Sequence, residues 1–138
     1  MFERFLVPLV LANTLNQVNG KTRFQKLMFL IQKEAERNEI KELDFDYEIY
    51  LHGPFSRELG LIIDDLVDKR YLEEESVETL SGYTKYVYTL TAKGEELVKH
   101  AMDKKLLPPE VLKCVKEILT KYGDIPLPHL VEEAYRQF

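Results

Sequence analysis

The chain has 138 residues, of which 45% are hydrophobic and 31% are charged, and its formal net charge is −5. This length and composition allow one compact domain with its own core, and the acidic balance argues against a protein that coats nucleic acid or an anionic membrane. A single cysteine excludes an internal disulfide and fits a reducing compartment. We therefore expect one cytoplasmic domain that spans residues 1–138.

The first forty residues predict two helices. Residues 2–18 are apolar on nearly every side, which indicates a buried helix, and the apolar run 5–12 within it is too short to cross a membrane and is interrupted by Pro8. The second helix begins where Thr22 stands three residues before Gln25, the spacing of a capping box. Four basic residues fall near the outer face of this second helix: Arg23, Lys26, Lys33 and Arg37.

In the middle of the chain, the spacing of the apolar residues changes from a helical period to an alternating one. Residues 45–51 alternate between apolar and polar side chains, which predicts a half-buried strand. Pro54 suits the first position of a helix that runs to about Arg70. Residues 71–75 and 85–90 then predict the two strands of a hairpin, joined by a long polar connection.

The last third of the chain predicts three helices. Thr91 caps the first of them, over about residues 92–105, and Gly94 in its first turn indicates a close backbone contact at that point. Two prolines end this helix, and two amphipathic helices follow around residues 110–122 and 130–138. Their apolar faces either pack on the same chain or form the interface of a homodimer, and the sequence leaves both open.

This order of elements matches a known layout. Helix, helix, strand, helix and hairpin follow one another as in a winged helix-turn-helix, and residues 86–94 resemble the end of a wing. We therefore predict a mainly α fold with a small antiparallel β-hairpin or sheet. Its winged-helix core covers about residues 2–91, and the extra helices cover about 92–138.

Two motifs narrow the resemblance. Residues 20–30, with the sequence GKTRFQKLMFL, resemble a helix of a prokaryotic family of small winged-helix-like proteins, and residues 52–56, HGPFS, resemble a turn of the same family. These uncharacterised proteins are related to the Panacea-domain (SocA-like) antitoxins, and the resemblance covers about residues 2–138. The resemblance implies a regulatory or antitoxin-type adaptor that acts by binding another protein.

Charge distribution bears on the choice of partner. A winged helix normally places its third helix in the DNA major groove, but residues 44–82 hold three basic and eleven acidic side chains, a net charge of −8. Aspartates on the outer face of the third helix would meet the phosphate wall, so we expect a protein partner instead. The expected partner-binding residues are Phe55, Ser56, Arg57, Gly60, Leu61 and Asp64, with supporting contacts from Tyr83 and Lys85 on the wing.

The alternative is a DNA-binding transcriptional regulator that docks through the basic face of the second helix. The favoured interpretation of that face is an ordinary solvated helix surface, offset by Glu34 and Glu36. The residues that would contact nucleic acid are Lys21, Arg23, Lys26, Lys33, Arg57 and Lys85.

No set of residues nominates a catalytic, metal or cofactor site. Gly20-Lys21-Thr22 resembles the end of a phosphate-binding loop, but Leu15 stands where that loop needs glycine, which leaves only an isolated anion at the helix N-terminus. The spacing of His52, His100 and His129 does not suit a metal pair. Cys114 is expected to be a packing residue rather than a redox thiol. We therefore predict a protein that is not an enzyme.

Overall fold

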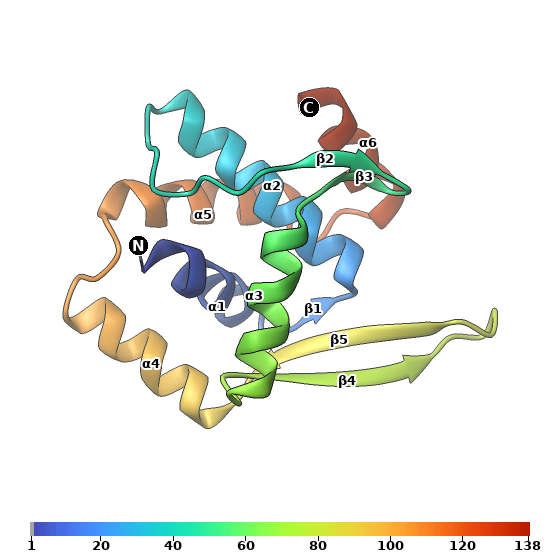
Figure 1. Ribbon diagram of the computed structural model, residues 1–138, viewed down its shortest axis with the longest axis horizontal. Helices are drawn as coiled ribbons and strands as arrows, with labels where there is room; N and C mark the ends of the chain where they lie inside the picture. The colour runs from blue at the N-terminus through green and yellow to red at the C-terminus, as the bar shows by residue number, and fades with distance from the viewer. Residues whose placement is uncertain (1) are drawn as a thin grey trace.

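The computed structural model describes residues 2–138 and shows a mainly helical protein with two small antiparallel sheets (Figure 1). The predicted fold class, mainly α with a small antiparallel sheet, is confirmed. The elements in chain order are α1 (Glu3–Leu15), β1 (Val18–Asn19), α2 (Lys21–Arg37), β2 (Glu48–Tyr50), β3 (Gly53–Phe55), α3 (Arg57–Asp68), β4 (Leu72–Glu78), β5 (Thr84–Leu90), α4 (Ala92–Asp103), α5 (Pro109–Tyr122) and α6 (Leu127–Gln137).

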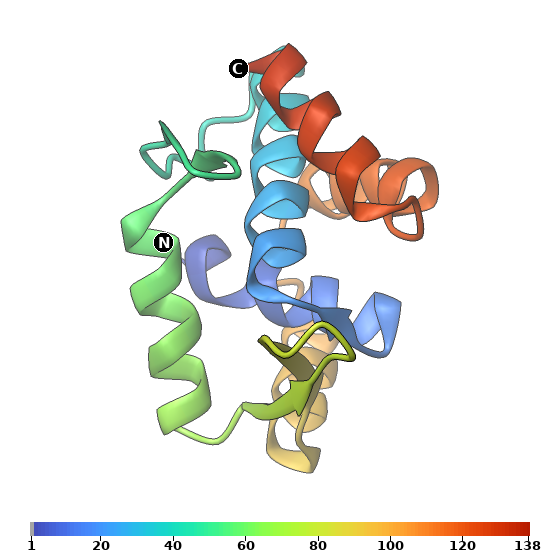
Figure 2. The same ribbon diagram turned by 90° about the vertical axis from the view of Figure 1, so that its right-hand side faces the viewer.

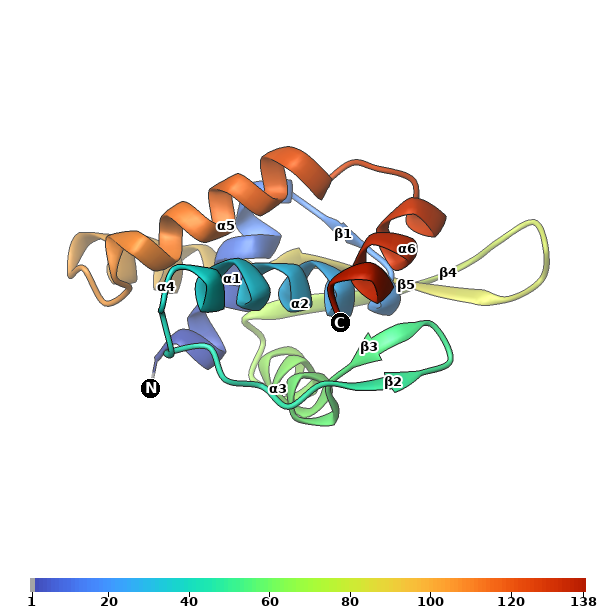
Figure 3. The same cartoon turned by 90° about the horizontal axis from the view of Figure 1, so that it is seen from above.

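Helix α2 lies at the centre of the molecule. Every residue from 24 to 32 is buried, and Figure 3 shows α5 and α6 on one side of the helix and the β2–β3 hairpin on the other. The buried faces of α5 and α6 join the same apolar core as α1 and α2. Part of the expected apolar face of α6 stays at the surface, where Tyr135 and Phe138 are 45% and 53% exposed. Within residues 2–138, none of the helices combines the length and the apolar character that a membrane crossing requires.

The larger sheet has the strand order β1–β5–β4, and its long hairpin projects from the body of the molecule (Figure 1). Pairing runs from Leu72 opposite Leu90 to Glu78 opposite Thr84, so the strands are longer than the pattern predicted. At the base of the hairpin, the buried ring of Tyr88 packs edge-on against Phe24 of α2 at 5.5 Å. This contact anchors the hairpin to the core.

Two predictions about the segment before α3 are wrong. Only residues 48–50 of the expected strand pair, and their partner is β3, in a separate two-stranded hairpin. Ile49 and Leu51 are 47% and 79% exposed because this hairpin stands apart from the larger sheet. Pro54 lies in β3, and α3 begins only at Arg57.

The helix caps were predicted with mixed success. Thr91 caps α4 as expected, since its hydroxyl accepts a hydrogen bond from Gly94 N at 3.0 Å. A Cβ atom at Gly94 would lie 2.2 Å from the Tyr71 carbonyl oxygen, which confirms the close backbone contact. The capping box at Thr22 is wrong: α2 begins at Lys21, its N-cap residue is Gly20, which has no side chain, and Gln25 binds Ser56 instead.

Candidate functional site

Helix α3 turns a mixed polar and apolar face to solvent. Its buried side chains follow a helical spacing: Leu59, Ile63 and Leu66. On the outer face, Leu61 is 61% exposed, and Arg57, Asp64 and Asp68 are also exposed. Asp64 and Asp68 form no ion pair within residues 2–138, so two free carboxylates follow the exposed leucine along the helix, and Arg57 precedes it by one turn.

Only some of the predicted partner-binding residues lie at the surface. Arg57, Leu61 and Asp64 lie on the outer face of α3, whereas Phe55 and Gly60 are half-buried. Ser56 is fully buried, and its hydroxyl accepts a hydrogen bond from Leu59 N at 3.1 Å as the N-cap of α3. Its side chain therefore belongs to the interior and not to the surface that the prediction assigned to it.

Gln25 of α2 fixes the start of α3. Its Oε1 accepts a hydrogen bond from Ser56 N, and its Nε2 donates one to Ser56 O, both at 2.9 Å. Lys26 Nζ donates to Pro54 O at 2.8 Å. The motif over residues 20–30 and the motif over residues 52–56 thus bind each other. Both contain the residues that hold α2 against β3 and α3.

Lys26 was predicted on the exposed basic face, and this is wrong: the residue is only 2% exposed. Burial disfavours the charged ammonium and lowers the pKa of Lys26 to about 8. Its Nζ has one hydrogen-bond partner and no carboxylate partner among the described residues. The signal in the sequence was position: Lys26 lies between the apolar residues Phe24 and Leu27.

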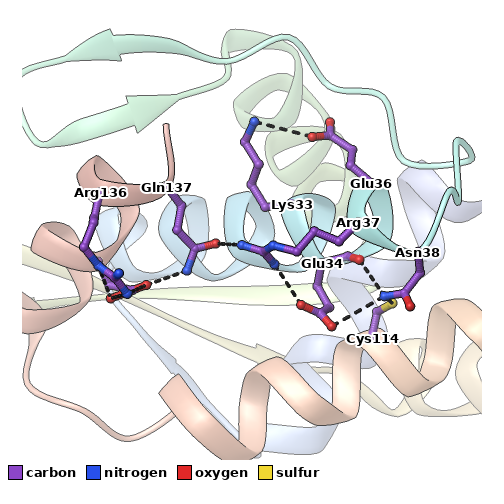
Figure 4. Close-up of polar contacts among 9 residues, drawn as sticks. Lys33, Glu34, Glu36, Arg37, Asn38, Cys114, Arg136 and Gln137 are labelled. Carbon is purple, nitrogen blue, oxygen red and sulfur yellow. Dashed lines mark hydrogen bonds and ion pairs between the residues drawn. The ribbon is translucent and has the colours of Figure 1, made fainter.

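The rest of the predicted basic face is interrupted. Lys33 pairs with Glu36 at 3.4 Å, and Arg37 pairs with Glu34 at 2.8 Å and contacts Gln137 of α6 (Figure 4). Arg23 is half-buried, and its desolvation lowers its pKa. Lys21 is exposed and lies over the ring of Tyr86 at 4.4 Å. These side chains therefore do not form a continuous cationic ridge.

The β4–β5 hairpin carries exposed apolar side chains near its tip. Val77, Leu80 and Tyr83 are exposed, and Lys85 is half-buried. The strand β4 also exposes three acidic side chains: Glu73, Glu75 and Glu78. In Figure 2, which faces the side from which the hairpin projects, α3 and the hairpin border one face of the molecule.

Two neighbouring cavities lie beside the start of α2. The first, of about 190 Å³, is bordered by the start of α2 and by the β2–β3 hairpin, and it is lined by Lys21, Thr22, Gln25, Lys26, Tyr50, Leu51, His52 and Phe55. The second, of about 170 Å³, reaches α3 and β5 and is lined by Lys21, Gln25, Phe55, Gly60, Ile63, Asp64 and Tyr88. Both cavities share the residues Lys21, Gln25 and Phe55.

The other chemistry-bearing residues lie apart. No group of three or more histidine, cysteine, aspartate or glutamate side chains in residues 2–138 is arranged to hold a metal ion. Cys114 is buried in the face of α5, near Asn38, and burial raises the pKa of its thiol (Figure 4). These surroundings suit a packing residue.

Comparison with known proteins gives one informative match. An uncharacterised protein of Bacillus subtilis (strain 168), YwgA, is 30% identical to this chain over 87 residues, which are 62% of this chain and 48% of YwgA. The chain thus matches about half the length of this relative. No protein-family model matches the chain.

Proposed function

We propose that this chain is a cytoplasmic, winged-helix-like regulator or antitoxin-type adaptor, related to the Panacea-domain antitoxins, that acts without catalysis by holding another protein. In this proposal the β4–β5 hairpin is the wing, and the partner covers the outer face of α3 and the wing. The observation that carries the proposal is Leu61, 61% exposed beside the exposed carboxylates of Asp64 and Asp68.

The chemistry of this face favours a protein partner. An exposed leucine offers apolar area to bury, and exposed carboxylates select a partner that carries lysine or arginine around its own apolar centre. Leu80 and Tyr83 on the wing would extend the same contact. Duplex DNA is the less favoured partner because its affinity comes largely from cations set against phosphate, and Asp64 and Asp68 occupy the helix that would enter the groove.

The experiment that tests this proposal compares two matched charge reversals in cells of the native host. Tagged chain is captured as wild type, as Asp64→Lys with Asp68→Lys, and as Glu96→Lys with Asp103→Lys on α4, where both residues are also exposed. The α3 variant should lose a specific protein at least tenfold, and the α4 variant should retain it. Equal recovery with both variants, or nuclease-sensitive capture of DNA, would contradict the proposal.

A further inference from the structure

The 190 Å³ cavity combines apolar walls with two lysines. Tyr50, Leu51 and Phe55 form its apolar side, while Lys21 and Lys26 bring positive charge, and no aspartate or glutamate of the described chain lines it. The start of α2 also borders the cavity without a side-chain cap, so the positive end of the helix dipole adds to the same field. The cavity is therefore suited to an anion with an apolar body.

Lys26 is the strongest element of this arrangement. An ammonium group has three N–H donors, and Lys26 uses one of them on Pro54 O at 2.8 Å. The residue is 2% exposed, and within residues 2–138 no carboxylate lies at ion-pair distance from it. A buried charge without a counterion is costly, so an incoming carboxylate would gain more here than at an exposed lysine.

We propose that this cavity is a binding site for a small apolar carboxylate, whose charge is held by Lys26 and Lys21 and whose hydrocarbon lies against Tyr50, Leu51 and Phe55. The volume is below that of typical drug-sized sites and suits a group of roughly ten non-hydrogen atoms. A free organic acid and the C-terminal residue of a peptide share this chemistry. The site is separate from the outer face of α3, so it stands or fails independently of the proposed function.

The test measures whether the negative charge of the ligand is recognised. Binding of phenylacetate and of its neutral amide, phenylacetamide, is measured by calorimetry at fixed ionic strength on wild type and on Lys26→Met. N-acetyl-glycyl-leucine with a free or an amidated C-terminus forms the second pair of probes. Leu51→Ala removes part of an exposed side chain that lines the cavity. Its matched control is Leu80→Ala, which removes the same atoms from an exposed leucine at the tip of the β4–β5 hairpin.

The acid should bind wild type with a dissociation constant of roughly 1 mM or less and at least tenfold more tightly than the amide. In Lys26→Met this preference should fall at least about threefold, since only Lys21 and the helix start remain, and Leu51→Ala should weaken binding of the acid while Leu80→Ala does not. If phenylacetate binds more tightly than phenylacetamide, a free organic acid is a sufficient ligand. If only the peptide pair shows a preference for the free carboxylate, the ligand is the C-terminus of a peptide. Equal affinity for acid and amide in both pairs, or a preference as large in Lys26→Met as in wild type, would overturn the proposal.

Discussion

The side chain of Gln25 binds both backbone polar groups of Ser56, through two hydrogen bonds of 2.9 Å that join residues 31 positions apart. Gln32, two turns further along α2, repeats this arrangement on the N–H and C=O of Phe45, again at 2.9 Å. The two glutamines thus hold both ends of the connection, at residues 45 and 56, against α2. The position of α3, and with it the proposed partner surface, depends on this connection.

Replacing Gln25 by leucine should destabilise the protein by about 1–3 kcal/mol, because it leaves the buried N–H of Ser56 without a partner, whereas the Ser56 C=O keeps its hydrogen bond from Gly60 N. Chemical denaturation measures the loss. Gln17→Leu is the control, since Gln17 is exposed and bonds only the nearby Asn19 side chain, and it should change stability by less than about 0.5 kcal/mol. Similar losses in the two variants would contradict this account of Gln25.

Two glycines in helices should respond to alanine in opposite directions. A Cβ atom at Gly94 would lie 2.2 Å from Tyr71 O, so Gly94→Ala should destabilise the protein by about 2 kcal/mol or more. At Gly60 the nearest atom, Gln25 Nε2, is 3.8 Å away, so Gly60→Ala should stabilise α3 by about 0.5–1 kcal/mol. Thermal and chemical denaturation of both variants decide this. A stable Gly94→Ala variant would show that the contact with Tyr71 is not close.

Sequence patterns predicted those features of the fold that depend on neighbouring residues. The apolar spacing of α3, the cap at Thr91 and the special role of Gly94 all arise within one turn of helix or one strand end, and each is confirmed. The capping box was wrong because α2 begins before Thr22, with Gly20 at the N-cap, and Gln25 instead binds Ser56, a partner 31 residues away that no local pattern indicates.

In the candidate site, too, local sequence patterns predicted some features, while others depend on contacts between distant segments. Leu61 and Asp64 lie on the outer face of α3, where helical periodicity placed them. Lys26 was placed on the surface because lysine is normally exposed, yet tertiary contacts bury it beneath Pro54. The cavity beside it combines α2 with the turn at Tyr50 to His52, and only the folded chain brings these segments together.

Burial of Lys26 should make stability depend on pH. Its pKa is about 8 in the folded chain and 10.5 as a free side chain, so the unfolded state binds more protons between these values. The free energy of unfolding of wild type, relative to Lys26→Met, should therefore rise between pH 8 and pH 10.5 by up to about 3 kcal/mol. Denaturant titrations at several pH values measure this difference, and a flat difference would show that Lys26 is not desolvated.

Cys114 should react slowly with thiol reagents. It is 3% exposed, and burial raises the pKa of its thiol, so thiolate is scarce at neutral pH. With a disulfide reagent at pH 8, native protein should react at least about 100-fold more slowly than chain unfolded in denaturant. Absorbance of the released thiol follows both rates. Comparable rates would instead indicate a reactive, accessible thiol.

Photo-crosslinking from the outer face of α3 tests the proposed function most directly. A benzophenone side chain is placed at position 61 or, as the control, at the exposed position 99 of α4, and cells of the native host are irradiated. We predict one discrete protein adduct from position 61 that is absent from position 99. Adducts to DNA from position 61, or the same adducts from both positions, would contradict a protein partner on α3.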